Sequence, residues 1–374
     1  MRAAGRPGGE EQVVSEPTAT AGAVQRLWQA VIGGDEHQAA ATVRDALAQG
    51  VSEETLLLQV IAPVQEKVGV EWAAGRISVA QEHAATAINE RVVAALAHRP
   101  GTSRPAPERG RVTVACVDGE WHALPARLVA EVLALHGWRV DYLGAQTPTP
   151  HLVAHLHLTN PDAVLLSGSM PTHLPTAHGA ITACQAIGVP VLAGGRAFGP
   201  QGCYATALGA DRWAADARAA AAVLAAGIPR PGASAIRHTV DDLPHLGDQE
   251  YTLVAQSRTR FVKQTLADLE DRFPAMRAYH RIQQERTAED IAYIVEFLAT
   301  ALYVDDPDLF TAFLTWTDGI LTARGVPARS LRAGLDALAG QLHDFPRALK
   351  MLEHGRTALT EHATRPVPGP DIHV

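Results

Sequence analysis

The 374-residue sequence contains only three cysteines, Cys116, Cys184 and Cys203, and their spacing is not that of metal ligands. Disulfides are therefore not expected, and Cys116, within an apolar segment, is expected to be a buried, reduced thiol. No cysteine precedes residue 116 or follows residue 203. Anything bound by the flanking segments is therefore not held through a cysteine.

The sequence also lacks a long apolar run. No segment approaches the roughly twenty apolar residues that span a bilayer, and the first residues lack the apolar core of a signal peptide. We therefore expect a cytoplasmic protein without a membrane partner. The net charge of −8 argues against nucleic acid as the main partner. No internal repeat is visible.

The length and the Pro- and Gly-rich stretches predict several domains joined by linkers. The predicted fold is multidomain, with α and α/β parts. Its segments are a disordered tail over 1–20, a four-helix bundle over 21–98, a Rossmann-like (flavodoxin-like) domain over 110–230, an all-α domain over 248–363 and a tail over 364–374. Asp35 and Ser52 are the expected N-caps within the bundle. The predicted C-terminal helices cover 251–269, 275–284, 288–303, 307–323, 329–342 and 347–359.

An acidic residue and a histidine follow the first predicted strand of the α/β domain. The strand covers 112–117, Glu120 and His122 follow it, and helical spacing resumes over 127–135. His122 is thus predicted at the carboxyl edge of a parallel sheet, where such folds bind ligands. Taken alone, a Glu-x-His triplet in a loop is more often a surface hydrogen bond than a metal site.

Two small-residue segments follow at informative distances. Forty-one residues separate Pro125 from Ser167-Gly168-Ser169, which ends the next apolar strand, and Gly194-Gly195 ends the strand after that. This pattern resembles the cobalamin-binding module of methionine synthase and methylmalonyl-CoA mutase, in which it is Asp-x-His-x-x-Gly, Ser-x-Leu and Gly-Gly. The resemblance covers residues 110–230. Glu120 replaces the usual Asp, and Pro125 the usual Gly.

The resemblance implies that His122 binds cobalt from below. Glu120 would hydrogen-bond His122, and Ser167 would support Glu120, because a ligating histidine needs its second nitrogen fixed. The nucleotide tail of the cofactor would enter the sheet, where Ser167, Ser169, Gly194 and Gly195 lack bulk. Pro125 is compatible with the first turn of a helix.

The bundle adds a second resemblance. Trp72 is followed ten residues later by Glu82-His83, as in the cobalamin-dependent light-sensing transcription repressors. The likeness implies that Trp72 shields the adenosyl group of adenosylcobalamin, that Val79 and His83 border the same pocket, and that Glu82 binds the ribose hydroxyls. Ala73 stands where those repressors carry the histidine that takes the upper cobalt position after illumination. No winged-helix segment is evident, so direct DNA binding is not expected.

The C-terminal helices resemble a globin-like arrangement. Together with the bundle and the α/β domain they resemble the photocobilins, light sensors whose C-terminal domain binds biliverdin. A bilin would need cations and ring contacts, and would be non-covalent without a cysteine. The candidates are Arg258, Arg260, Arg281 and Arg324 for the propionates, and Tyr279, His280, Tyr293 and Trp316 for the rings. His280, His343 and His354 lack the context of a haem ligand.

These resemblances predict a photoreceptor rather than an enzyme. Light would cleave the cobalt–carbon bond of adenosylcobalamin, held between bundle and Rossmann domain, and change the domain arrangement and oligomeric state. Biliverdin would be a second chromophore, and the expected partners are further copies of the chain and a downstream effector protein. Two alternatives stay open: a corrinoid carrier for methyl transfer, and a non-photochemical cobalamin-binding protein.

Overall fold

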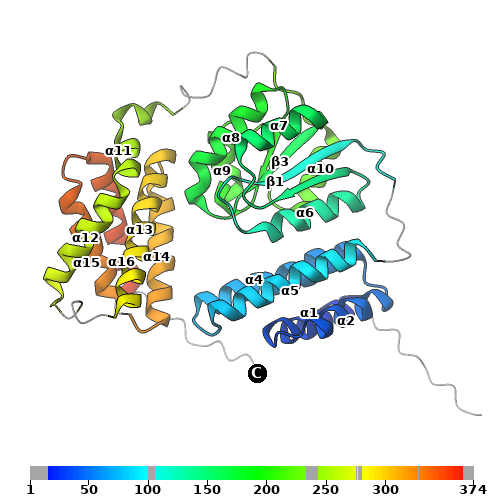
Figure 1. Cartoon of the computed structure of the whole chain (residues 1–374), viewed down its shortest axis with the longest axis horizontal. Helices are drawn as coiled ribbons and strands as arrows, with labels where there is room; N and C mark the ends of the chain where they lie inside the picture. Colours follow the sequence, from blue (N-terminus) through cyan, green and yellow to red (C-terminus); the bar gives the residue numbers. More distant parts are fainter. Residues whose placement is uncertain are drawn as a thin grey trace, which may run out of the picture. The chain divides into compact units, whose positions relative to one another are not determined.

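The computed structural model describes residues 16–99, 106–232, 243–274, 276, 280–326 and 328–364. It divides the chain into two compact units, a helical one over residues 1–72 and 76–104 and a larger one over residues 73–75 and 105–374 (Figure 1). Among the described residues, no helix has both the length and the apolar character that crossing a bilayer requires.

The first unit consists of helical segments that match the predicted ones closely. They are α1 (Glu16–Ile32), α2 (Glu36–Ala48), the continuous run of α3 (Glu53–Thr55), π-helical η1 (Leu56–Ile61) and α4 (Ala62–Ala73), and α5 (Val79–Ala97). The predicted tail over 1–20 is wrong for residues 16–20, because α1 already begins at Glu16. Pro17 is compatible with a helical first turn, and Glu16 is favourable there. Residues 1–15 lie outside the described part.

Side-chain caps fix the beginnings of these helices. Asp35 accepts a hydrogen bond from the Gln38 N–H at 2.8 Å, and Ser52 accepts one from the Thr55 N–H at 3.0 Å, which confirms both predicted caps. Ser78 and Gln81 form a reciprocal capping box at the start of α5. Apolar residues spaced three and four apart are then buried between α1, η1 and α5.

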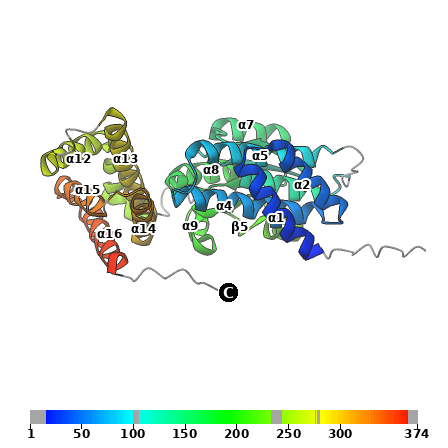
Figure 2. The same ribbon diagram turned by 90° about the horizontal axis from the view of Figure 1, so that it is seen from below.

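The second unit begins with a parallel sheet, as predicted. Its strands are β1 (Arg111–Cys116), β2 (Arg139–Gly144), β3 (Ala163–Ser167), β4 (Val191–Gly194) and β5 (Arg212–Ala214), in the order β2-β1-β3-β4-β5. The connecting helices include α6 (Ala123–Leu135), α7 (Thr149–Thr159), α8 (Leu174–Ala186), α9 (Cys203–Ala207) and α10 (Ala217–Ala226), which Figure 1 labels around β1 and β3. Figure 2 gives a second view of α7, α8 and α9. This flavodoxin-like strand order has its topological switch point between β1 and β3.

The strands that carry the predicted motif end level with one another. Cys116 on β1 pairs with Ser167 on β3, and Ser167 pairs with Gly194 on β4. Because all three strands are parallel, the loops that follow them meet at one edge of the sheet. This register brings the segments after residues 116, 167 and 194 together.

The C-terminal helices differ from the prediction in three places, the first being that the helix predicted over 275–284 begins only at Arg281, because His280 is its extended N-cap residue. They are α11 (Glu250–Gln256), α12 (Arg258–Arg272), α13 (Arg281–Val304), α14 (Pro307–Ala323), α15 (Ala328–Gln341) and α16 (Pro346–Thr364), after the short 3₁₀-helix η6 (Pro244–Asp248). The predicted helix over 251–269 is interrupted at Ser257, whose φ and ψ of −90° and 6° leave the helical range. The predicted boundary over 285–287 is absent, because a polar run in α13 does not break a helix.

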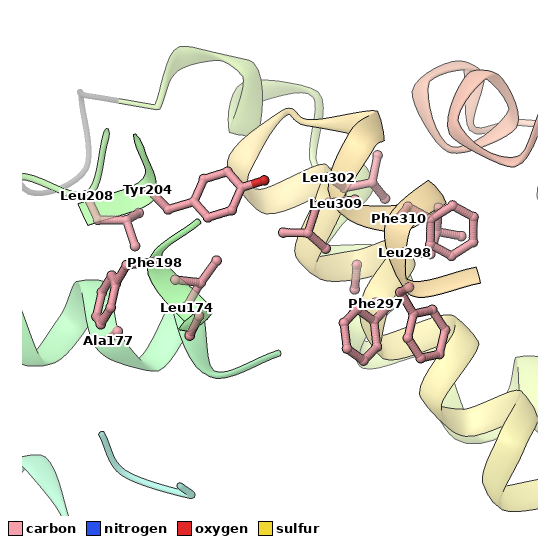
Figure 3. Packing of buried hydrophobic residues seen from close by; sticks show 14 of the residues in the cluster. Leu174, Ala177, Phe198, Tyr204, Leu208, Phe297, Leu298, Leu302, Leu309 and Phe310 are labelled. Carbon is pink, nitrogen blue, oxygen red and sulfur yellow. The ribbon is translucent and has the colours of Figure 1, made fainter. Parts of the chain in front are cut away.

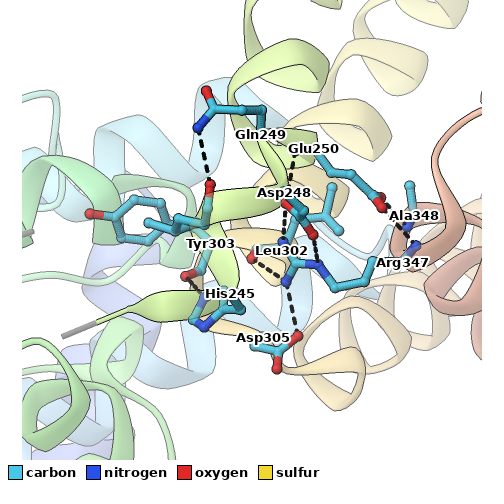
Figure 4. Close-up of polar contacts among 10 residues, drawn as sticks. His245, Asp248, Gln249, Glu250, Leu302, Tyr303, Asp305, Arg347 and Ala348 are labelled. Atoms are coloured by element: carbon cyan, nitrogen blue, oxygen red, sulfur yellow. Dashed lines mark hydrogen bonds and ion pairs between the residues drawn. The ribbon is translucent and has the colours of Figure 1, made fainter. Parts of the chain in front are cut away.

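Charged side chains join the beginning of this helical region to its end (Figure 4). Glu250, buried in α11, accepts hydrogen bonds from the backbone N–H groups of Arg347 and Ala348 at 3.0 and 2.8 Å, so it caps α16 across 98 residues. The Arg347 guanidinium in turn binds Asp248 and Asp305. Burial lowers the pKa of Arg347 less than its two carboxylate partners raise it.

One buried cluster contains residues from both the α/β part and the C-terminal helices. Figure 3 shows Leu174 and Phe198 of the α/β part together with Leu298 and Phe310 of the helices. Polar contacts accompany this core. The Tyr204 hydroxyl donates to Asp306 at 2.6 Å, and His178 Nδ1 lies 2.7 Å from the Tyr303 hydroxyl oxygen. The segments predicted as two domains thus lie within one compact unit.

Candidate functional site

Glu120 and His122 lie at the topological switch point, in the loop after β1. His122 is the N-cap residue of α6, and its side chain is 58% exposed, whereas that of Glu120 is 1% exposed. An almost fully buried carboxylate is costly unless it is hydrogen-bonded. The local structure therefore depends on the partners of Glu120.

Glu120 binds His122 through one oxygen and the loop after β3 through the other. Its Oε1 accepts from His122 Nδ1 at 2.6 Å and from the His122 backbone N–H at 2.9 Å. Its Oε2 accepts from the backbone N–H groups of Ser169 and Met170 at 2.6 and 2.9 Å. The predicted bond between Glu120 and His122 is thus present.

The predicted support of Glu120 by Ser167 is not what the structure contains. Near this loop Ser167 forms a backbone hydrogen bond: its carbonyl oxygen accepts from the Val117 N–H at 3.0 Å. Glu120 has one methylene more than the usual aspartate, and its carboxylate reaches the next two backbone donors, Ser169 and Met170, instead. The replacement of Asp by Glu is therefore matched by a different set of donors.

These bonds determine the ionisation of the site. Burial alone would raise the pKa of Glu120, but the hydrogen bonds from His122, Ser169 and Met170 outweigh it and lower the pKa to about 2. The carboxylate is consequently ionised at neutral pH and accepts the Nδ1 proton of His122. This fixes the tautomer in which Nε2 is the nitrogen able to ligate a metal.

A single histidine suffices only for a metal that brings its other ligands with it. Within the described residues, no group of three or more His, Cys, Asp and Glu side chains is arranged to hold a metal ion. A macrocycle that occupies the in-plane positions needs only an axial residue from the protein, as haem does. The donor set at His122 fits a metal of that kind.

The glycines at the strand ends have a packing role of their own. Gly195 has a φ of +98°, and a Cβ there would lie 2.2 Å from the Gly168 carbonyl oxygen. A Cβ on Gly168 would in turn lie 3.1 Å from Ala197 Cβ. Gly195, one of the small residues predicted to admit a cofactor tail, is thus also required by the close approach of these two loops, and a Cβ on Gly194 would lie 3.3 Å from the Ala214 carbonyl oxygen of β5.

Two residues of this edge were not among the predicted ones. Met170 donates its backbone N–H to Glu120, and the His173 ring lies 3.1 Å from the position of a Cβ on Gly119, whose φ is +88°. Both follow β3 directly. Their position just after Ser169 at the shared edge was the only sequence signal that could have indicated them.

The bundle residues predicted to cover the cofactor lie around the α4–α5 turn. Trp72 is near the end of α4 and is partly buried, and Val79 is the first residue of α5 and is 54% exposed. Glu82 and His83 are in contact, with His83 Nδ1 2.5 Å from Glu82 Oε2. Glu82 Oε1 also accepts from the Thr86 hydroxyl at 3.0 Å.

The predicted bilin residues occupy separate helices of the C-terminal region. Arg258 pairs with Glu296, His280 caps α13 with Gln283, and Arg324 is the C-cap of α14. Tyr293 and Trp316 are each 50% exposed. Trp316 lies beside the stacked pair Phe297 and Phe313, whose ring centroids are 3.7 Å apart and which were not predicted. Tyr279 lies outside the described residues.

Comparison with known families identifies the cofactor of the first two regions. Two models of the B12 binding domain match the chain, one over residues 110–224 and the other over residues 23–97. The first match contains Glu120 and His122, and the second contains Trp72, Glu82 and His83. The chain therefore carries a cobalamin-binding module, made of a helical part and a Rossmann-like part.

One curated relative and several solved structures are similar to the chain. The HTH-type transcriptional repressor CarA of Myxococcus xanthus is 30% identical over 143 residues, which are 38% of this chain and 46% of the repressor, so the match spans less than half of that relative. The monomethylamine corrinoid protein of Methanosarcina barkeri is 21% identical with a TM-score of 0.48 and covers 55% of this chain and 98% of its own. A cobalamin-binding protein of Desulfitobacterium hafniense is 22% identical with a TM-score of 0.31 and covers 56% of this chain and 97% of its own.

Proposed function

We propose that the protein is a light sensor that binds adenosylcobalamin with His122 as the lower cobalt ligand. The observation that carries this proposal is the Glu120–His122 pair at the switch point, within the segment that matches a B12 binding domain. When bound, adenosylcobalamin supplies a cobalt–carbon bond that light can break. The residues of the chain hold the cofactor and respond to the loss of its upper ligand.

His122 and Glu120 would set the lower side of the site. The ionised Glu120 keeps Nδ1 of His122 protonated and orients the ring, so that Nε2 can bind cobalt. The backbone donors of Ser169 and Met170 keep the carboxylate in place.

The upper side would involve Trp72, Val79, Glu82 and His83. An indole packs on a nucleoside, and a carboxylate accepts from vicinal ribose hydroxyls. Ala73 lacks an imidazole, so the upper position after illumination would go to water or His83. The similarity to a transcriptional repressor over part of its length supports the sensor function.

His122→Ala tests the lower-ligand assignment. We expect the variant to fold normally, to bind cobalamin more weakly and to show the absorption spectrum of a cofactor without an imidazole ligand. Absorbance titration with hydroxocobalamin provides both readings. His136→Ala, at the C-cap of α6, is the control and should bind like the parent protein. Unchanged affinity and spectrum in His122→Ala would refute the assignment.

The proposed response to light is a change in self-association. Loss of the upper ligand would remove contacts that only one arrangement of the chain makes, and so shift a two-state equilibrium. Gel filtration of protein loaded with adenosylcobalamin, before and after green light, measures it. We expect a changed elution volume; an unchanged volume with photolysed cofactor would rule out the switch.

A corrinoid carrier for methyl transfer is the second candidate, because the same module and the same lower ligand would serve it. The two functions differ in the upper ligand that they require. A carrier should lose its methyl group to a thiol or a similar acceptor in the dark, with the help of a partner enzyme. A light sensor should be inert in the dark and respond only to illumination.

The C-terminal helices are proposed to bind biliverdin without a covalent bond. Tyr293 and Trp316, each half exposed, provide aromatic surface on α13 and α14, and Trp316 lies beside the buried Phe297–Phe313 stack. Arg258 and Arg324 are the candidates for the propionates, and both already have acidic neighbours, Glu296 and Asp290 respectively. Expression with biliverdin should give a far-red absorption band, and its absence would remove the second chromophore from the proposal.

A further inference from the structure

A polar network runs through the interior of the first unit, between α4 and α5. Asn89 Nδ2 donates to Gln65 Oε1 at 2.8 Å, Gln65 Nε2 donates to the Thr86 hydroxyl oxygen at 2.7 Å, and the Thr86 hydroxyl donates to Glu82 Oε1 at 3.0 Å. We call these four side chains, Asn89, Gln65, Thr86 and Glu82, the Glu82 network. It begins at the fully buried Asn89 and ends at the partly exposed Glu82.

Every bond of the Glu82 network points toward the carboxylate. A hydroxyl has a single proton, and the Thr86 oxygen already accepts from Gln65, so the Thr86 proton is directed to Glu82. Hydrogen bonds aligned in this way strengthen one another. His83 binds the other oxygen of Glu82. The carboxylate is therefore held in one orientation by a donor at each oxygen.

The polar residues of the network replace apolar residues where α4 and α5 pack. Glu82, Thr86 and Asn89 are spaced by four and three residues, so they share one face of α5, and Gln65 approaches them from α4. An apolar face would pack these helices without desolvating an asparagine, a glutamine and a threonine. Within the described residues Asn89 Oδ1 has no partner, which adds to that cost. Departures from an apolar core of this kind occur at functional sites.

We infer that Thr86, held by Gln65 and Asn89, is a positioning residue that fixes Glu82 for vicinal hydroxyls and so sets a preference for cobalamins whose upper ligand is a nucleoside. The inference rests on the proposed function, since it requires Glu82 to face that ligand. Thr86 would not touch the cofactor. Its effect would be confined to upper ligands that carry a ribose, because small upper ligands give Glu82 no hydroxyl pair to bind.

The test compares two cofactors and two substitutions at one position. Thr86→Val keeps the shape but removes the donor, and Thr86→Ser keeps the donor. Dark absorbance titrations give the Kd for adenosylcobalamin and for hydroxocobalamin. We expect Thr86→Val to weaken adenosylcobalamin binding about five- to tenfold, the size of one ordinary hydrogen bond because Thr86 acts only through Glu82, without a matching change for hydroxocobalamin. Thr86→Ser should restore adenosylcobalamin binding.

Controls separate this outcome from a loss of structure. Thr20→Val is the matched control, because the Thr20 hydroxyl bonds the Glu16 carbonyl of its own helix. If Thr86→Val does not fold, Gln65→Met interrupts the network one bond earlier. Equal weakening for both cofactors, or a Thr86→Ser variant as weak as Thr86→Val, would overturn the inference. Absence of any cobalamin binding by the parent protein would instead refute the proposed function.

Discussion

Glu120 shows how much of a site can depend on one side chain. Its two oxygens accept four hydrogen bonds, two from His122 and two from the loop after the neighbouring strand. The sequence predicted the pair with His122, since an acidic residue two positions before a histidine is a recognisable pattern. It could not predict the donors 49 and 50 residues away, because backbone N–H groups leave no trace in residue identity.

Substitutions of Glu120 should change metal binding more than their size suggests. Glu120→Ala removes the partner that orients His122, so we expect cobalamin affinity to fall by about 10- to 100-fold, as for other residues that support a metal ligand. The cobalamin affinity of Glu120→Asp should lie between those of the parent protein and Glu120→Ala, because a shorter side chain cannot keep all four hydrogen bonds. Absorbance titration with hydroxocobalamin measures both. Glu108→Ala, at an exposed position, is the control, and parental affinity in Glu120→Ala would contradict the prediction.

At the scale of elements, hydrophobic spacing predicted most of the helices and strands. The five parallel strands alternate with helices as expected, and the caps Asp35 and Ser52 are confirmed. Two of the wrongly predicted helix boundaries lie at polar residues. Ser257 interrupts a helix without a glycine or proline to signal it, and the polar residues of α13 continue a helix because Arg, Gln and Glu are good helix formers.

In the C-terminal region, helix packing predicts that alanine substitutions at two glycines change the free energy of unfolding in opposite directions. A Cβ on Gly355 of α16 would lie 2.5 Å from Leu314 Cδ1, whereas a Cβ on Gly319 of α14 would meet nothing within 4 Å. Gly355→Ala should therefore lower the free energy of unfolding by about 1 to 3 kcal/mol through overpacking. Gly319→Ala should raise it by about 0.5 to 1 kcal/mol, because alanine favours a helix.

Urea unfolding followed by circular dichroism measures both glycine variants against the parent protein. The two substitutions add the same methyl group to helices of the same region, so they control for each other. Equal changes in both variants would show that the approach of α16 to α14 is not as close as the structure has it.

At the scale of the molecule, the sheet and the C-terminal helices form one unit. His178 and Tyr303 are 125 residues apart in sequence and 2.7 Å apart in space, and Tyr204 binds Asp306 across a similar separation. Composition predicted a linker between the two regions, of which residues 233–242 lie outside the described part. It could not reveal that their apolar surfaces are buried against each other, because each surface has the spacing of an ordinary core.

This contact predicts how stability changes at alkaline pH. Burial, and then the neighbouring Tyr251, raise the pKa of Tyr303 to about 12 from an ordinary value of 10.0. Between these values the unfolded chain loses the proton that the folded protein retains, so stability falls as the pH rises through this window. The melting temperature of the parent protein should thus fall more steeply from pH 10 upward than that of Tyr303→Phe.

The comparison between the two proteins isolates Tyr303 from other groups. Cys116 and Cys184, whose pKa values burial raises to about 12, contribute equally to both. Tyr303→Phe should start from a lower melting temperature, because it loses the bond to His178. Parallel curves above pH 10 would show that Tyr303 ionises as it does in the unfolded chain.

The loop after β3 connects Glu120, the partner of the proposed metal ligand His122, to the C-terminal helices. Met170 donates to Glu120, the 3₁₀-helix η2 (Pro171–His173) follows it, and η2 packs on α13. We expect hydroxocobalamin to slow hydrogen exchange in η2 and α13 of the parent protein and to leave it unchanged in Glu120→Ala. Exchange by mass spectrometry, at saturating cofactor, measures the difference; equal protection in both proteins would contradict this connection.

The backbone origin of the Ser169 and Met170 donors also affects which sequences can keep this site. Any residue with an N–H group supplies the same bond, so these positions are free to vary among related proteins without loss of the carboxylate's support. Proline is the exception, because it has no N–H to donate. Pro171, one position later, leaves both donors intact. A survey of natural variants should therefore find many residue types at position 170, small ones at position 169, where the cofactor tail is expected to pass, and an almost complete exclusion of proline at both.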